Sequence, residues 1–220
     1  MKVFNRTVVT AFLLHALILI FTSLISDSFK PRREGDGLFD ATGIHMIDSF
    51  SRWDAGWYSG IAREGYDKAE KIAFFPMYPM LMKFIGSFFQ FLGDKNVVIA
   101  GLLISNISFF FALAFIFEIV KFRFSLRVAQ STIYFISTFP TSFFFSAVYT
   151  ESLFLLFVAG VFLFGYRKQW FYAGLMLAGA MLTRNLGAFV VFSLLIIYFK
   201  ERKLTFNLEL VKDAFKMFGP

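Results

Sequence analysis

The sequence predicts an all-α, polytopic transmembrane protein, and three observations point to that fold class. The 220-residue chain is 58% hydrophobic and 17% charged, whereas a soluble domain averages about 45–50% apolar and about 25% charged residues. Aromatic residues make up 21% of it. Its longer apolar runs reach the roughly 20 residues that a helix needs to cross a bilayer. A soluble fold of this size cannot bury so much apolar surface, which excludes a soluble enzyme or binding domain.

The first apolar run, residues 7–25, follows a short basic N-terminus. It is similar to a signal peptide, but it is longer than a typical hydrophobic region and no A-x-A-like cleavage site follows it. We therefore expect an uncleaved first span. The polar stretch 26–72 contains turn-forming Pro and Gly residues and is predicted to be a large outer loop that carries short amphipathic helices.

Apolar character returns at 73–92, where Pro76 and Pro79 favour a re-entrant or interfacial segment over a full crossing. The later apolar runs are predicted to be spans or half-spans at 97–120, 128–147, 153–166, 170–182 and 186–199. The last three hold only 13 or 14 residues each, too few to cross about 30 Å of hydrocarbon alone. The tail at 205–220 mixes apolar and charged residues and is expected to be interfacial, which completes a single membrane domain.

The charged residues predict how these segments are oriented. The net charge of +7 could suggest nucleic acid, but Lys and Arg occur in short clusters at the ends of apolar runs, which is typical of topology signals. The clusters are the N-terminus, 121–127, 167–168 and 200–203, and the positive-inside rule places all four in the cytoplasm. The outer loop and the polar breaks at 149–152 and 183–185 then face outside, where we expect them to converge on one cavity.

No metal or cofactor is predicted. The chain has no cysteine, so it has neither a disulfide framework nor a thiolate metal site. His15 and His45 have no partners at metal-ligand spacing. No Gly-rich phosphate loop follows a strand pattern, so a nucleotide-sugar site of Rossmann type is not expected.

Asp54 is the first candidate for chemistry, in a charged and aromatic segment that runs from Arg52 to Tyr66. It lies between Trp53 and Trp57, and we expect the tryptophans at the level of the lipid headgroups. A carboxylate at this face could remove a proton from an acceptor hydroxyl. The alternative is a helix-start Asp that satisfies backbone N–H groups.

Arg184 is the second candidate, because it interrupts a long apolar run. Such an arginine costs roughly 2.5–3.5 kcal/mol on insertion scales, so it needs a partner or a ligand. A phosphate or diphosphate suits its planar, bidentate donors. The alternative is a structural ion pair with Glu151 or Glu118. Glu151 could itself pair with Arg184, hold a sugar hydroxyl or cap the helix that follows.

Four blocks of sequence resemble a known family. They are WDAGWY at 53–58 with IA at 61–62 and GY at 65–66, AFFPMYP at 73–79, FPTSFFFSAVYTESLF at 139–154, and LTRNLG at 182–187. In this order they are similar to the PIG-V family, the GPI mannosyltransferase 2 proteins and their prokaryotic relatives. We interpret the chain as a prokaryotic homologue of that family.

The resemblance implies an integral-membrane glycosyltransferase of the GT-C type, with Asp54 as the base. Such enzymes take a mannosyl or other hexosyl residue from a polyprenyl- or dolichyl-phosphate donor at the non-cytoplasmic face, with inversion. Arg184, Arg63 and Arg52 would then hold the donor phosphate. The residues expected to contact substrate are Trp53, Tyr58, Tyr66, Tyr78, Tyr149, Glu151 and Asn185.

The predicted partners are the lipid-phosphate sugar, a glycan or glycolipid acceptor and membrane lipids, but no nucleic acid. Localisation would be the plasma membrane if the protein is prokaryotic and the endoplasmic reticulum membrane if it is eukaryotic. Family members usually have about twice as many spans, so we expect an N-terminal portion, a truncated product or half of an enzyme with a second membrane subunit. The alternatives are a non-catalytic membrane subunit and a small transporter or lipid flippase that uses Arg184 and Glu151.

Overall fold

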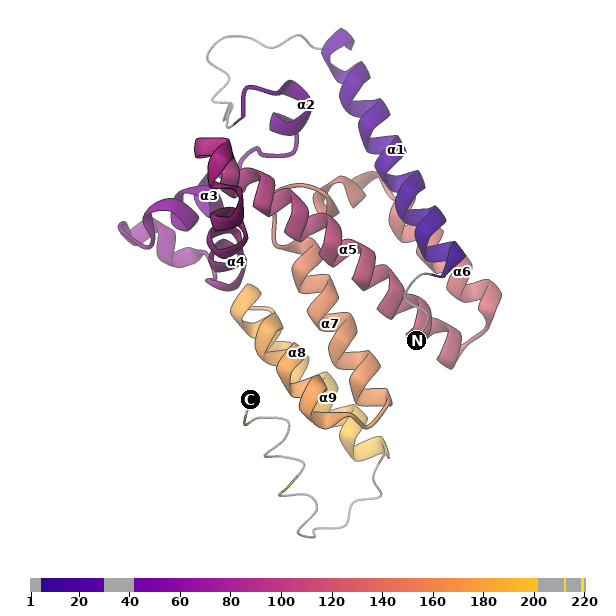
Figure 1. Cartoon of the computed structure of the whole chain (residues 1–220). Helices are drawn as coiled ribbons and strands as arrows, with labels where there is room; N and C mark the ends of the chain where they lie inside the picture. Colours follow the sequence, from indigo (N-terminus) through magenta and orange to yellow (C-terminus); the bar gives the residue numbers. More distant parts are fainter. Residues whose placement is uncertain (1–4, 30–41, 202–211, 213–218, 220) are drawn as a thin grey trace.

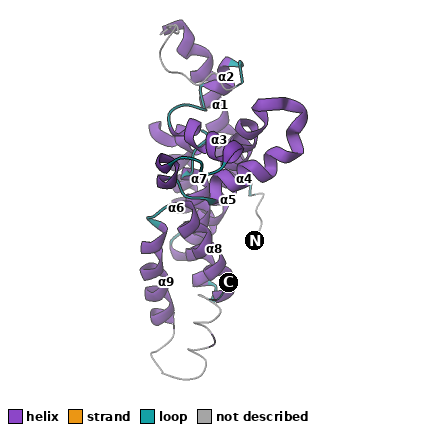
Figure 2. Ribbon diagram, turned by 90° about the vertical axis from the view of Figure 1, so that its left-hand side faces the viewer, coloured by secondary structure: helices purple, strands orange, loops and turns teal. Residues whose placement is uncertain are grey.

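The computed structural model describes residues 5–29 and 42–201, together with 212 and 219, and every structural statement below concerns these residues. The described part is built from helices and connecting loops and contains no strand, which confirms the all-α prediction (Figure 2). The elements are α1 Arg6–Phe29, α2 His45–Asp48, α3 Asp54–Glu64, η1 Ala69–Ala73, α4 Met77–Gly86, η2 Ser87–Lys95, α5 Asn96–Arg123, α6 Leu126–Thr138, η3 Pro140–Phe145, α7 Glu151–Tyr166, α8 Trp170–Thr183 and α9 Gly187–Glu201. The tail predicted at 205–220 lies outside the described residues, except for 212 and 219.

Two described helical stretches are long and apolar enough to cross a membrane, Arg6–Ser26 and Met77–Arg123, the second of which is kinked at Phe89 and Gly93. The apolar helices α7, α8 and α9 are shorter. Within the second stretch α5 has 28 residues, which corresponds to about 42 Å of helix. The short helices α7, α8 and α9 follow one another end to end, and the breaks between them are where polar groups gather.

The central helix is α5, which packs against α1, α4, α6 and α7 (Figure 1). Its buried face joins two apolar cores. One contains Tyr78 and Met82 of α4 with residues of α3 and α7, and the other contains Val8 of α1 and Ile133 of α6. A third core joins α7, α8 and α9 around Trp170. The helices α1, α3, α4, α6 and α7 therefore contact α5 directly, and α8 and α9 are joined to it through α7.

The α4 segment folds back along only the first part of α5. Tyr78, near the start of α4, donates its hydroxyl hydrogen to the Gly101 carbonyl and shares a hydrogen bond with Ser105. At the other end of α4, a Cβ on Gly86 would lie 3.5 Å from Val97. The segment does not extend along the whole length of α5. This arrangement agrees with a re-entrant path, which stays our prediction.

The stretch 128–147, predicted to be a span or a half-span, is divided into two helices in the structure. The helix α6 ends at Thr138, and η3 begins at Pro140. Phe139 is extended, with φ −62° and ψ 139°, because the ring of a following proline disfavours helical geometry. Buried His15 fastens this corner to α1, since its Nδ1–H donates to the Ser137 carbonyl at 2.9 Å and its Nε2 lies 2.9 Å from the Ser146 hydroxyl.

Glycine lets α7, α8 and α9 approach closely. A Cβ on Gly179 of α8 would lie 2.5 Å from the Phe157 ring, and a Cβ on Gly160 of α7 would lie 2.7 Å from Met176. Small residues at helix contacts are typical of membrane bundles, because they let backbones come together. The turn from α8 into α9 is the tightest, since a Cβ on Gly187 would lie 2.4 Å from the backbone of Ala180.

The basic clusters gather toward one end of the bundle. The ends that carry the basic clusters, including those of α5, α7 and α9, lie in the lower right of Figure 1. The short helices α2, α3 and α4 and the α8–α9 turn lie toward the upper left. We call the two ends the basic end and the outer end, and their orientation relative to the membrane stays our prediction from the positive-inside rule.

Replacing Gly187 tests how tight the α8–α9 turn is. We expect Gly187→Ala to destabilise the protein by about 1–3 kcal/mol, because the obstacle is backbone and cannot rotate away. Thermal unfolding in detergent, followed by tryptophan fluorescence, measures the change. Gly86→Ala is the matched control, since its Cβ would meet other atoms at an ordinary 3.5 Å. Equal stability of the two variants would contradict the tight turn.

Candidate active site

Asp54 is the first residue of α3 and is exposed. The helix dipole favours a negative charge at this position. The residue before it, Trp53, has a backbone φ of +49°, in a region that residues other than glycine rarely adopt. Such strain costs about 1–3 kcal/mol and persists only where the surroundings enforce it. The backbone that presents Asp54 is therefore held by contacts from elsewhere in the fold.

Tyr149 supplies one of those contacts. Its hydroxyl donates to the Arg52 carbonyl at 3.1 Å, although 97 residues separate the two. One residue earlier, the Val148 N–H donates to the Phe50 carbonyl at 2.8 Å. Burial, with the nearby negative charges of Asp54 and Glu151, raises the pKa of Tyr149 to about 12. Tyr149 therefore stays protonated at neutral pH and can keep donating to the Asp54 turn.

Arg184 and Glu151 form an ion pair, with 2.8 Å between Nη1 and Oε1. Arg184 follows α8 in extended conformation, and Glu151 is the first residue of α7. The two side chains are 36% and 29% exposed, so the pair is neither fully buried nor freely solvated. The second oxygen of Glu151 is buried and has no hydrogen-bond partner among the described residues. Of the alternatives for Arg184, the structure thus contains the pair with Glu151.

Tyr58 lies close to these groups. Its ring is buried edge-on against Phe74 and Tyr78, with ring centres 5.2 Å apart in each case. Burial raises the pKa of its phenol, and the charges of Glu151 and Asp54 raise it further, while Thr150 and Arg184 oppose them. Each of these groups thus lies within electrostatic reach of one hydroxyl.

We call Asp54, Tyr58, Tyr149, Glu151 and Arg184 the outer polar cluster. It unites the three features expected to meet at the outer face, namely the first loop and the breaks near residues 150 and 184. Its acids and its arginine come from the ends of three helices, α3, α7 and α8. The cluster could place a carboxylate and a guanidinium around one polar ligand.

Three predicted site residues lie outside the cluster. Arg63 is nine residues along α3 from Asp54, about 13 Å, and donates to the Asp94 carbonyl at 2.6 Å. Tyr66 donates its hydroxyl hydrogen to the Phe74 carbonyl at 2.8 Å and braces the loop. Tyr78 is fully buried and has no surface to offer a ligand, which favours a packing role.

The remaining three lie beside the cluster. Arg52 is half-buried in the turn that Tyr149 holds. Trp53 is 71% exposed, which leaves its ring available to a sugar or to lipid headgroups. Asn185 is exposed in the α8–α9 turn, where its carbonyl accepts from the Ala188 N–H.

The comparison with known families identifies the chain. A family model described as Mannosyltransferase (PIG-V) matches residues 1–218. The chain belongs to this mannosyltransferase (PIG-V) family. The family match confirms the resemblance in the four sequence blocks, and the structure brings parts of three of them together in the outer polar cluster.

Two curated relatives of this PIG-V chain are proteins named GPI mannosyltransferase 2 from Cryptococcus neoformans var. neoformans serotype D, in strains JEC21 and B-3501A. Each is 29% identical over 164 residues, a match that covers 69% of this chain and 38% of the relative. The matched part is therefore less than half the length of these relatives. No solved structure matches the chain.

A second charged group stabilises the segment that follows α3 in the PIG-V chain. It was not identified from the sequence. Buried Lys71 of η1 forms ion pairs with Glu64, at 2.8 Å, and with Asp67. These hydrogen bonds raise the pKa of Lys71, and the bond to Lys71 lowers the pKa of Asp67. The i, i+4 spacing of Asp67 and Lys71 was the available signal. The set closes the loop between α3 and α4 and so positions α3.

Coupling across the Arg184–Glu151 pair is measurable. In a double-mutant cycle with Arg184→Met and Glu151→Gln, we expect a coupling energy above about 1 kcal/mol, the upper limit for exposed pairs. Unfolding in detergent by denaturant measures it. The longer, 3.5 Å pair of Arg167 and Glu118 serves as the control and should show weaker coupling. Equal coupling in the two cycles would contradict a specific outer pair.

Removing the Tyr149 hydroxyl tests the anchor of the Asp54 turn. A net hydrogen bond contributes about 1 kcal/mol, so Tyr149→Phe should speed amide hydrogen exchange across residues 52–56 about fivefold. Tyr66→Phe loses a comparable bond elsewhere and should leave these amides unchanged. If both variants exchange as the wild type does, the hydroxyl does not hold the turn.

Proposed function

We propose that the chain forms the donor-side catalytic site of a membrane mannosyltransferase. It would transfer a mannosyl residue from a polyprenyl- or dolichyl-phosphate sugar to a hydroxyl of a glycan or glycolipid, at the non-cytoplasmic face. The observation that carries the proposal is the outer polar cluster, where an exposed carboxylate and an ion-paired guanidinium gather at the end of the bundle opposite the basic clusters.

Asp54 is proposed as the general base. Its exposed carboxylate would accept the proton of the acceptor hydroxyl as that oxygen attacks the anomeric carbon of the sugar. The bond from that carbon to the donor phosphate oxygen breaks, and the lipid phosphate leaves with the bonding electrons. Attack from the face opposite the leaving group inverts the configuration. The strained turn at Trp53 would fix the direction in which the carboxylate points.

Arg184 is proposed to bind the leaving phosphate. A guanidinium has five N–H donors, and the pair with Glu151 uses the Nη1 side, so other donors can reach phosphate oxygens. Glu151 would then act as a positioning residue that orients the guanidinium. Arg52, in the same turn as Asp54, is a second cation within the proposed site. Arg63, at the far end of α3, is left out of it.

The two phenols are proposed to bind substrate without acting as bases. The raised pKa values of Tyr58 and Tyr149 keep both neutral, so neither competes with Asp54 for protons. The Tyr149 hydroxyl already donates to the Arg52 carbonyl, so it would contact substrate as a hydrogen-bond acceptor, whereas Tyr58 could donate. The exposed ring of Trp53 would stack on the sugar or anchor at the headgroups.

The substrates are proposed from the relatives' names. The curated relatives are named as GPI mannosyltransferases, which supports mannose as the transferred sugar. We propose the endoplasmic reticulum membrane, or the plasma membrane of a prokaryote, as the location. A glycan or glycolipid acceptor and a second membrane subunit are proposed as partners.

Sugar transfer tests the proposal directly. Membranes that contain the chain are supplied with radiolabelled polyprenyl-phosphate mannose, and transfer to lipid and glycan fractions is counted. We expect Asp54→Asn to lower the rate by about 10²-fold or more, as loss of a general base does. Glu70→Gln, which removes an exposed carboxylate from η1, should have no effect. Transfer by Asp54→Asn at the wild-type rate would remove Asp54 as base, and no transfer by the wild type would favour a non-catalytic subunit.

A further inference from the structure

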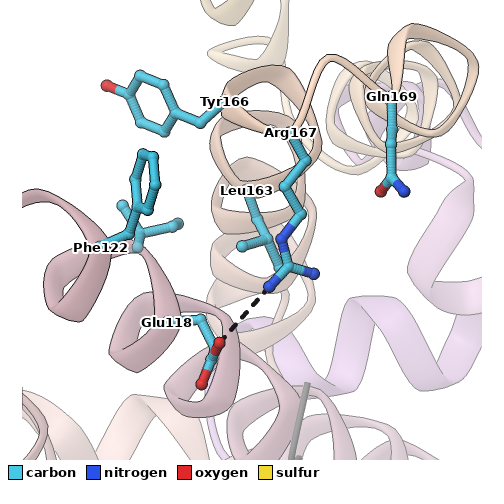
Figure 3. A pocket seen from close by; sticks show the side chains of 7 residues that line it. Glu118, Phe122, Leu163, Tyr166, Arg167 and Gln169 are labelled. Atoms are coloured by element: carbon cyan, nitrogen blue, oxygen red, sulfur yellow. Dashed lines mark hydrogen bonds and ion pairs between the residues drawn. The ribbon is translucent and has the colours of Figure 1, made fainter.

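A second site lies at the basic end of the bundle, between α5 and α7, where a cavity of about 420 Å³ is lined by both polar and apolar side chains (Figure 3). Its apolar wall is made of Ile119, Phe122 and Leu163, and its polar side chains include Glu118, Arg167 and Gln169. In Figure 3 the Arg167 guanidinium points toward Glu118, and Tyr166 extends beside Phe122. This cavity is far from the outer polar cluster in the fold and takes no part in the proposed transfer.

We propose that this cavity binds the phosphate headgroup of an anionic phospholipid of the cytoplasmic leaflet. The two segments that contribute its lining, 118–127 and 163–169, contain five cations in their sequence, Lys121, Arg123, Arg127, Arg167 and Lys168, against the single carboxylate of Glu118. Basic pockets between membrane helices on the cytoplasmic side bind anionic lipid headgroups in this manner. The apolar wall would receive the glycerol and the first methylenes of the acyl chains.

Arg167 is the principal phosphate ligand in this proposal. Its contact with Glu118 is 3.5 Å long, whereas charge-assisted hydrogen bonds are about 2.7–2.9 Å long and the Arg184–Glu151 pair of this chain measures 2.8 Å. The Arg167 side chain is 38% exposed. A guanidinium that is loosely paired and partly exposed can turn its fork to two phosphate oxygens while Glu118 stays beside it.

The turn between α7 and α8 holds the site in place. The backbone N–H groups of Arg167, Lys168 and Gln169 donate to carbonyls of the last turn of α7, at 3.2, 3.0 and 2.9 Å. Gln169 lines the cavity and immediately precedes α8, which no described side chain caps. The positive end of the α8 dipole therefore lies at the edge of the cavity and favours an anion there.

Arg123 lies beside Tyr166, a residue that lines the cavity. Its guanidinium carbon lies 4.9 Å from the centre of the Tyr166 ring, a cation–π contact that holds the charge over a lining residue. A phosphate in the cavity would thus meet Arg167, with the charge of Arg123 held nearby on the Tyr166 ring. This arrangement suits a headgroup that enters from the membrane surface.

Lipid retention tests the inference. The purified full chain, reconstituted in phosphatidylcholine discs, is titrated with phosphatidylglycerol, and bound lipid is measured by native mass spectrometry. We expect selective retention of phosphatidylglycerol, and a loss of about tenfold in apparent affinity for Arg167→Gln. Lys83→Gln, which removes an exposed cation from α4, is the control and should bind as the wild type does.

Two further arms make the result decisive. Ile119→Trp fills the cavity without changing charge, so it should also lower retention, and it covers the case in which Arg167→Gln does not fold. Inorganic phosphate and glycerol phosphate should not compete at millimolar concentration. Equal retention by Ile119→Trp and wild type, or competition by the soluble phosphates, would overturn the lipid site. The readout is lipid binding, so a failed mannose-transfer assay leaves this outcome unaffected.

Discussion

The charge of Arg184 is the constraint around which the outer end of this structure is arranged. A guanidinium at the end of an apolar helix must find a partner, and Glu151 supplies one 2.8 Å away. The pair fixes the start of α7 beside the end of α8. Residues 148 and 149, just before α7, hold the loop that presents Asp54. One ion pair thus connects the breaks of three separate chain segments.

Close packing of α7 against α8 allows this arrangement to form. Gly160 and Gly179 let α7 and α8 approach until side chains of one touch the backbone of the other, and Gly187 lets the chain reverse directly after Arg184. Dispersion contacts and small residues hold such helices together where lipid removes the hydrophobic drive. The polar cluster therefore depends on apolar packing well below it, so a mutation in the α7–α8 contact can move Arg184 without touching it.

The two ends of the bundle differ in how tightly their arginines are paired with carboxylates. Cations collect at the basic end, where Arg167 has a long contact with Glu118, and acids share the outer end with a well-paired arginine. A loosely paired arginine is free to receive an anion, whereas a tightly paired one is already oriented. The two proposals follow this difference, with lipid-headgroup binding at the first and positioning of the donor phosphate at the second.

Composition by itself determined the all-α membrane fold, and the position of Arg184 in an apolar run determined its need for a partner. The side of the membrane on which the basic clusters lie stays a prediction. The four sequence blocks determined the family. Only the tertiary structure decided that the partner is Glu151 and not Glu118, which lies at the opposite end beside Arg167. It also separated Arg63 and Tyr78 from the cluster and ended α6 at Thr138. Local patterns report what each residue requires, but which residues meet depends on how helix ends are brought together by packing between distant segments.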